Sequence, residues 1–521
     1  MGPMGHMCPI PPEIERNGQV SRRSLAILML LLLTGIQCLA GRRIVPSTDH
    51  LPLGDWTYDA MVSLASDGLV PGYAARLFEG DRLFNRMEMA QLVSLIIESS
   101  ADTQLGSAQF VLIDHLVSEF NPELMYFHAG VVEKWKGRTT NISLPMSQEA
   151  FPLGFVKGTA TDDTDNNTEL AVPYHLSGFA HLAGQAFAIA TLSDREKKFF
   201  QQERRDDGLT KVFARVIDGG TVWSVGREFL EWGPVYGGSM IVSDNSSAFN
   251  QARVSKEVEF GPIFGRVKIT QFATSFQDNG ARTYVFGRRY EKPFHHNFHL
   301  GFGEIAKTTF LPNPLFAIMP FYLYQHLFSK QDAQINTLYS TDLTYVANNG
   351  MQAYGDLVID DMTSIKLLGK AGDRPRKIGF GGGIYFPKVF SDGRLSTFRA
   401  EYVTVDRLTY GATRPEVPQL AYTHGGDVIG SPTGPNAKAI YLRGERYFSD
   451  KFSAIAEYFN QWQSTPEDPQ RGHMRSVSLM AAYDLTPSTS VALRVAPFRT
   501  ALPGEPTESD TKYELRASFG F

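Results

Sequence analysis

Along most of this chain, hydrophobic and polar residues alternate with a period of two. The last ten residues, KYELRASFGF, show the pattern most clearly, with Tyr513, Leu515, Ala517, Phe519 and Phe521 at every second position. Such alternation is typical of a β-strand that faces two different environments. Because this strand runs to the last residue, its open edge needs a partner. We therefore expect it to pair with the first strand of a closed barrel.

The same pattern of strands and turns runs from about residue 178 to the end of the chain. Asp218-Gly219-Gly220 between two apolar segments, 210–216 and 221–225, is a hairpin signal. Asp194 to Asp207 is expected to be a charged loop, and the apolar run 314–328 to be two strands broken at Pro320. Seven further segments have the length of transmembrane strands, about ten residues: 265–276, 377–386, 396–408, 438–448, 451–463, 476–485 and 490–497.

Charged residues lie inside several of these expected strands. They are costly toward lipid and acceptable toward a wet lumen. The pattern therefore predicts an all-β fold, a large antiparallel transmembrane β-barrel of about 18 strands over residues 173–521. The charged residues are Arg399, Glu401, Arg443, Glu445, Glu457 and Arg494.

Composition agrees with a barrel but does not establish one. Hydrophobic residues make up 43% of the chain, yet its mean hydropathy is only -0.19, and we find one long apolar run. A helical membrane protein would need several such runs. The 36 Phe and 21 Tyr residues would supply interfacial aromatic girdles. A soluble all-β protein would have the same counts, so both classes stay open on composition alone.

The long apolar run lies near the N-terminus and has the form of a secretory signal peptide. Arg22 and Arg23 precede SLAILMLLLLTGI, and Ala40 offers a small residue for cleavage, so we expect residues 1–40 to be removed. Both cysteines, Cys8 and Cys38, lie in this leader. Its loss removes three Arg and two Glu, which takes the formal charge from -5 to -6. This acidic balance disfavours nucleic acid as a partner.

Residues 50–97 have helical rather than strand periodicity. Apolar residues recur at helical spacing after Tyr58, and Gly68 ends that helix. Asn85 is a good N-cap for a second helix that carries an apolar stripe. Residues 98–172 are expected to be a linker with one short helix.

This helical module resembles an S-layer homology (SLH) domain. The matching blocks are Asp55-Trp56, the DGLVPGY segment that contains Gly72 and Tyr73, and Asn85-Arg86-Met87-Glu88 in place of the family's Thr-Arg-Ala-Glu. The resemblance implies binding to peptidoglycan or its secondary cell-wall polymer. Trp56 would then form part of a groove wall, Arg86 would pair with an anionic group on the glycan, and Glu88 would orient it. Alternatively, Arg86 and Glu88 are a solvated helix start and Trp56 is core. Expected glycan-binding residues are Asp55, Trp56, Gly72, Tyr73, Arg86 and Glu88.

Four blocks in the strand region resemble a second family, the Wzi-like capsule assembly proteins of the outer membrane. They are VGREFLEWGPVYGGSMIVSDN at 225–245, residues 284–304, DLVIDD at 356–361 and GGDVIGSPTGPN at 425–436. A terminal strand ending in Phe also resembles the assembly signal of bacterial outer-membrane barrels. The Wzi resemblance implies a large barrel that helps to attach capsular polysaccharide. Arg227, Glu231 and Trp232 would bridge barrel wall and lumen, and Trp232 would stack on sugar; alternatively, Trp232 is a girdle aromatic at a turn.

Motifs for catalysis or cofactor binding are scarce in the sequence. We find no Gly-x-Ser-x-Gly elbow, no HExxH and no phosphate-binding loop, so we expect neither an enzyme nor a bound cofactor. A barrel hydrolase stays open as a third class, because its scattered catalytic residues would escape a motif search. His295, His296 and His299 form a cluster that could bind a metal, but no carboxylate or cysteine stands at a fitting spacing.

The sequence thus predicts a protein in the outer membrane of a diderm bacterium, surrounded by outer-membrane lipid, with its SLH domain in the periplasm. It would tie the outer membrane to the cell wall and act in attachment or assembly of capsular polysaccharide, with oligomers supplying avidity. The alternative is an SLH-anchored general diffusion porin.

Overall fold

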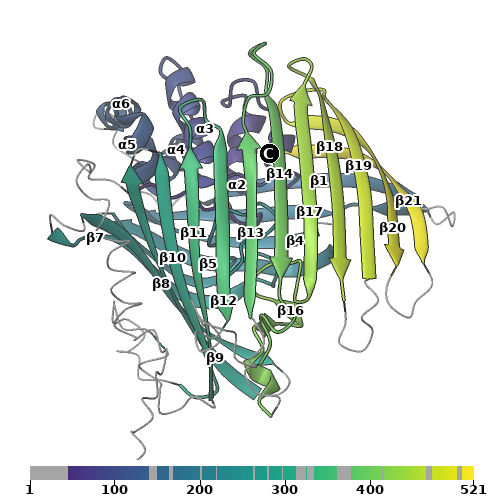
Figure 1. Ribbon diagram of the computed structural model, residues 1–521. Coiled ribbons are helices and arrows are strands. Elements are labelled where there is room, and N and C mark those ends of the chain that lie inside the picture. Colours follow the sequence, from purple (N-terminus) through teal and green to yellow (C-terminus); the bar gives the residue numbers. More distant parts are fainter. Residues whose placement is uncertain are drawn as a thin grey trace, which may run out of the picture.

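A closed antiparallel β-barrel forms most of the molecule (Figure 1). The computed structural model describes residues 45–139, 150–162, 168–199, 202–218, 220–261, 265–278, 281–295, 297–311, 324, 334–360, 377–412, 416–464, 472–501 and 507–521. The expected signal peptide lies outside these residues. Within them, the main sheet has nineteen strands; β2 pairs only with β1, so eighteen strands close the ring.

The strands follow one another around the barrel in chain order. Their bounds are β1 Ala150–Asp162, β2 Thr168–Ala171, β3 Tyr174–Ala183, β4 Ala186–Phe199, β5 Gln202–Asp218, β6 Thr221–Glu228, β7 Phe249–Glu259, β8 Arg266–Asp278, β9 Ala281–His295, β10 Phe298–Thr308, β11 Ile335–Val346, β12 Gln352–Asp360, β13 Ile378–Phe386, β14 Ser396–Val405, β17 Ala437–Tyr447, β18 Phe452–Gln463, β19 Gly472–Asp484, β20 Thr489–Ala501 and β21 Glu508–Gly520; β15 Thr423–His424 and β16 Asp427–Val428 form a separate hairpin.

The last strand closes the barrel, as its alternation predicts. β21 pairs with β1 from Phe155↔Gly520 to Asp162↔Tyr513. Along β21, Leu515 and Phe519 point outward and are exposed, whereas Glu514, Arg516 and Ser518 point inward and are buried. The predicted fold class is therefore confirmed.

Two expectations about this region differ from the structure. Residues 194–207 do not form a charged loop, because β4 and β5 extend through them as one long hairpin with cross-strand pairs from Asp194↔Asp207 to Phe199↔Gln202. The barrel also begins at Ala150 rather than at residue 173, so the expected linker contains β1 and β2. The apolar run 314–328 lies outside the described residues, except for Tyr324.

In the described residues before Ala150 there are six short helices: α2 Trp56–Ser66, the 3-10 helix η2 Ala75–Phe78, α3 Arg86–Ser99, α4 Ser107–Glu119, α5 Asn121–Phe127 and α6 Ala129–Thr139. Asp55 caps α2, and Asn85 caps α3 in a capping box with Glu88, as expected for these residues. No helix in the described part of the chain is both long and apolar enough to cross a membrane. We call residues 45–139 the helical segment.

The helical segment lies at the end of the barrel where the C-terminus and the short turns are (Figure 1). Ala75 donates its amide to Pro487 in the β19–β20 turn, and Gly520 lies close to Val62 and Ser66 of α2. Long connections, such as 406–436 between β14 and β17, lie at the opposite end. Short turns are periplasmic and long loops are extracellular in outer-membrane barrels, so we expect the helical segment on the periplasmic side.

Candidate functional site in the barrel lumen

Two inserts pack against the inner wall of the barrel: the helical segment and the connection between β6 and β7, residues 229–248, which we call the luminal loop. The helical segment shares one apolar core with the inner wall. Trp56 is fully buried, and its ring lies 4.8 Å from that of Phe187 and 5.9 Å from that of Phe179. Trp56 is therefore a core residue between helix α2 and strands β3 and β4.

Ion pairs join the helical segment to the wall around this core. Asp59 on α2 accepts hydrogen bonds from Lys211 Nζ at 3.0 Å and contacts His175 Nε2 at 2.6 Å. Burial alone would raise the pKa of Asp59, but these two neighbours outweigh it and hold the pKa below its usual range. Further pairs of the same kind link Arg76 with Asp484 at 3.1 Å and Asp81 with Arg516 at 2.6 Å.

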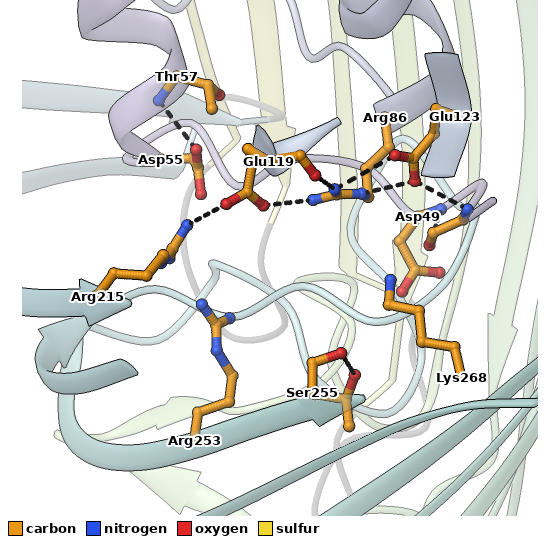
Figure 2. A network of polar contacts seen from close by, with 12 residues as sticks. Asp49, Asp55, Thr57, Arg86, Glu119, Glu123, Arg215, Arg253, Ser255 and Lys268 are labelled. Atoms are coloured by element: carbon orange, nitrogen blue, oxygen red, sulfur yellow. Dashed lines mark hydrogen bonds and ion pairs between the residues drawn. The ribbon is translucent and has the colours of Figure 1, made fainter. Parts of the chain in front are cut away.

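Arg86, which the SLH resemblance assigns to glycan binding, lies in a chain of buried ion pairs (Figure 2). Its guanidinium donates to Glu119 and Glu123, each at 2.9 Å. Glu119 also accepts from Arg215 on β5 at 3.0 Å, and Arg215 continues to Glu228 at 2.8 Å. Burial opposes ionisation of Glu119, but Arg215 and Arg86 lower its pKa to about 2. In this conformation Arg86 joins helices α3, α4 and α5 to the wall.

The other SLH-type residues also have partners within the chain. Glu88 accepts from Arg82 at 2.8 Å and from the Tyr385 hydroxyl at 2.6 Å. Asp55 accepts from the Thr57 amide. Gly72 occupies an exposed turn with φ +78, and Tyr73 packs partly buried against the core. Arg86 and Glu88 both lie in the first turn of α3. Trp56 does not join them, because its ring packs against the aromatic side chains of β3 and β4.

Glu231 organises the luminal loop from within. Its carboxylate accepts from the backbone amides of Ser239 at 2.8 Å and Asp244 at 2.9 Å, which closes the loop on itself. Burial, together with the nearby Asp244 carboxylate, raises the pKa of Glu231 to about 8. A carboxyl group that holds two buried amides is a structural support for a loop without regular secondary structure.

Wall carboxylates hold the luminal loop from outside. Glu401 on β14 accepts from the amides of Tyr236 and Gly237 at 2.7 and 2.9 Å, and Asp356 on β12 accepts from the Met240 amide at 2.8 Å. The loop's apolar side chains complete a second buried core with the wall, which contains Val235, Met240, Ile241, Val242, Phe249, Phe272, Val358 and Val403.

The structure separates the three residues that the Wzi resemblance grouped. Trp232 is 3% exposed and packs edge-on against Phe272, with ring centroids 5.2 Å apart, so it belongs to the second core. Glu231 lies beside it in the loop. Arg227 instead is exposed on the outer face of β6, where it donates to the carbonyl of Ala248 at 3.2 Å. In the structure, Trp232 is thus neither a girdle aromatic at the membrane interface nor an exposed ring on which a sugar could stack.

The two inserts meet inside the barrel. The Leu53 amide donates to Asp244 at 3.1 Å, and the Gly233 amide donates to Asp49 at 3.1 Å. Arg289 on β9 donates to both Asp49 and Asp342, which ties this junction to the wall. A continuous network therefore runs from the helical segment to the luminal loop. Sequence reasoning missed Asp49 and Glu119, since neither lies in a strand pattern or a recognised motif.

The histidine cluster is only partly covered by the described residues. His299 on β10 is buried and packs edge-on against Tyr126, with ring centroids 5.8 Å apart, while His296 lies outside the described residues. Among the described residues no group of three or more metal-binding side chains is suitably arranged.

Comparisons with known proteins agree with this architecture. The family model described as capsule assembly protein Wzi matches residues 158–497. Among solved structures, the chain is similar to Wzi of Escherichia coli, described as an outer membrane protein involved in group 1 capsule assembly and a carbohydrate-binding β-barrel. The identity is 12%, the TM-score is 0.52, and the alignment covers 92% of this chain and 99% of that chain.

The chain also matches OccK3 (OpdO) of Pseudomonas aeruginosa, with 12% identity, a TM-score of 0.43, and coverage of 72% of this chain and 96% of that chain. No curated protein matches it. Because the family model covers more than half of the chain, the Wzi resemblance is confirmed. The protein is an outer-membrane β-barrel that belongs to the Wzi capsule assembly family.

Proposed function

We propose that this protein binds surface polysaccharide at the outer membrane and acts in capsule assembly, and that it is not a diffusion porin. The observation that carries the proposal is the pair of inserts in the lumen. A porin needs an aqueous channel through the barrel. Here the helical segment packs against the inner wall at the periplasmic end, and the luminal loop packs against it farther along.

The extracellular side supports a binding role. The luminal loop is joined to the long connection 406–436: the Ser243 amide donates to Ile429 at 2.8 Å, and the Asn245 side chain donates to Val428 at 2.8 Å. Two loops held together in this way form a pre-organised surface, which lowers the cost of ordering when a polymer binds. The β15–β16 hairpin, with its exposed Gly425-Gly426 turn, belongs to this surface.

Two measurements on the full-length protein test the proposal. Purified protein in detergent should retain purified capsular polysaccharide in a pull-down, and it should give no large stable conductance in a planar bilayer. The matched variant replaces residues 425–428 by a Gly-Ser linker of equal length, outside the barrel strands; it should bind polysaccharide less while the barrel stays folded. A large open channel in the unmodified protein, together with no polysaccharide binding, would support the porin instead.

A second candidate function is the cell-wall tether implied by the SLH-like blocks. For this role Arg86 would have to leave Glu119 and Glu123, because in the described conformation both carboxylates occupy its guanidinium. The tether therefore requires the start of α3 to separate from Glu119 and Glu123 within the helical segment. If the tether operates, Glu119→Gln, which weakens this contact, should increase retention on purified sacculi, and Arg86→Ala should abolish it. Equal retention of the unmodified protein and both variants counts against the tether.

A further inference from the structure

The outer wall formed by β17 to β20 changes in character along its height. These four strands lie side by side in the barrel (Figure 1). Over most of their length the outward side chains are apolar, and Leu479, Tyr483 and Leu493 are about half exposed. This is the surface expected for contact with lipid. Toward the end of the barrel opposite the helical segment, the outward positions carry cationic and aromatic side chains instead.

Two arginines face each other on this part of the wall. Arg475 on β19 and Arg499 on β20 are direct cross-strand partners, and both are exposed. They have the same parity as the exposed leucines of their strands, so they point outward, whereas Arg494 has the other parity and pairs with Glu457 inside the barrel. Like charges directly opposite each other destabilise a strand pair. An anion bound between the two arginines would remove this cost.

Neighbouring strands extend the positive surface. Lys438 on β17 is exposed, and its cross-strand partner Trp462 on β18 is in turn the partner of His473 on β19. The rings of Trp462 and His473 stack with centroids 5.9 Å apart, and the Arg475 guanidinium carbon lies 5.5 Å from the centroid of the Tyr458 ring. We call this surface the cationic patch; it consists of Lys438, Trp462, His473, Arg475 and Arg499.

The cationic patch has no acidic partner in the described part of the chain. No described carboxylate forms an ion pair with Lys438, Arg475 or Arg499, and Glu508 on the adjacent strand β21 has the parity of the inward face. The opposite end of the same wall differs, because the outward Arg446 of β17 pairs with Asp392 at 3.0 Å. The protein thus neutralises a wall cation at one end and leaves several exposed at the other.

The cationic patch lies near one edge of the apolar band. Arg475 is eight positions along β19 from Tyr483 (483 − 475), which pairs with the exposed Phe452 near the end that carries the helical segment. Eight residues span about 27 Å of strand, or about 20 Å in height at a tilt of about 40°. The apolar band of such barrels is about 25 Å tall. The long side chain of Arg475 therefore reaches from the edge of the band toward the headgroups.

We propose that the cationic patch binds a phosphorylated lipid headgroup in the leaflet at this end of the barrel, which we expect to be the outer leaflet. A guanidinium binds phosphate through two parallel hydrogen bonds, so Arg475 and Arg499 hold one phosphate between them. Lys438 adds a further positive charge, and Trp462 occupies the position of an interfacial aromatic. The occupant is a lipid rather than a soluble polymer because the patch continues the lipid-facing wall and points away from the lumen. This inference is independent of polysaccharide binding at the connection 406–436.

Native mass spectrometry of the full-length protein in nonionic detergent tests the proposal, with diphosphorylated lipid A as the probe. The unmodified protein should retain this lipid in preference to phosphatidylethanolamine, which has no net charge. Arg475→Gln/Arg499→Gln should bind it at least about tenfold more weakly, the scale of losing charge-assisted hydrogen bonds. The matched control is Arg446→Gln, which removes an outward cation at the other end and should bind as the unmodified protein does. Heat-modifiable gel mobility verifies that each barrel is folded.

Thermal unfolding gives a second readout that separates binding from a structural role. In lipid-free detergent, Arg499→Gln should unfold at a higher temperature than the unmodified protein, because it relieves the repulsion from Arg475. Added lipid A should stabilise the unmodified protein and have less effect on this variant. A variant that is destabilised in lipid-free detergent would show that Arg499 supports the strand pair and would contradict the proposal.

Three binding results would also overturn it. One is equal retention of lipid A by the unmodified protein and Arg475→Gln/Arg499→Gln, and another is retention of phosphatidylethanolamine as strong as that of lipid A. The third is displacement of lipid A by inorganic phosphate or by soluble acidic polysaccharide, which would make a free anion or the polymer the occupant. Polysaccharide retention by the double variant should be unchanged, so failure of this proposal is distinguishable from failure of the proposed function.

Discussion

The two inserts in the lumen are held by different chemistry. The helical segment meets the wall through side chain to side chain ion pairs, such as Asp59 with Lys211 and Asp81 with Arg516. The luminal loop meets the wall mainly through its own backbone amides, which donate to Glu401 and Asp356. The attachment of the helical segment depends on its side chains, while the attachment of the luminal loop depends on the path of its backbone. The helical segment should therefore be separable from the barrel, and the luminal loop should be part of it.

The largest effects should come from removing the buried tryptophan of each insert. Trp56→Ala and Trp232→Ala should each cost about 3–5 kcal/mol, because each leaves a cavity in a buried core. Hydrogen exchange should speed up across α2 to α4 in Trp56→Ala, and across residues 235–243 in Trp232→Ala. If either variant speeds exchange in both inserts equally, the lumen is one cooperative unit and the distinction fails.

Glu119→Gln should weaken the attachment of the helical segment. It leaves the buried guanidiniums of Arg86 and Arg215 without their shared carboxylate, at a cost of about 3 kcal/mol to docking of the segment. Protease sensitivity of residues 45–139 measures this loss. Glu133→Gln is the matched control, since Glu133 and its partner Lys136 are 67% and 62% exposed and such pairs contribute little. Equal sensitivity of the two variants would show that the Arg86 network does not hold the segment.

Glu401→Gln makes the corresponding change for the luminal loop. One of the two acceptor oxygens becomes a donor facing the amides of Tyr236 and Gly237, which should cost about 1–3 kcal/mol. Exchange at residues 235–240 should rise while that of α2 stays constant. The opposite pattern, with faster exchange in the helices alone, would mean that Glu401 acts through the helical segment.

Strand periodicity was enough to predict the barrel. Alternate positions along a strand identified the two faces of the wall, because a closed wall imposes one environment on each face. Leu515 in β21 faces outward, whereas Arg516 in β21 and Arg399 and Glu401 in β14 face inward. The hairpin at 194–207 was predicted as a loop because its residues are mostly charged. In the structure these residues continue β4 and β5, which pair with each other there. The N-cap signal at Asn85 correctly gave the start of the second helix.

The site residues were harder to predict, since their partners are far away in the chain. Arg86 and Glu88 were recognised from a short block, yet their neighbours Glu123 and Tyr385 come from α5 and β13. Trp232 was placed beside sugar or lipid because a WGP turn looks exposed, whereas the loop folds inward onto Phe272. Periodicity reports the environment of a strand, but it carries no information on a loop that enters the lumen.

The effect specific to the luminal loop should be a pH dependence from Glu231. Its pKa in the folded protein is about 8, against an ordinary value of 4.5, because burial and the Asp244 carboxylate disfavour the charged form. Between these values the folded state binds more protons than the unfolded state, so the group's contribution is fully present below pH 4.5. It is lost as the pH rises toward 8, at no more than about 1.4 kcal/mol per pH unit. Thermal unfolding followed from pH 5 to 8 should show this decline in the unmodified protein and a flatter profile in Glu231→Gln, which stays neutral. If stability falls with pH equally in the unmodified protein and in Glu231→Gln, other groups cause the decline. If hydrogen exchange then rises with pH only in the helical segment, the titrating carboxyl group lies in that insert.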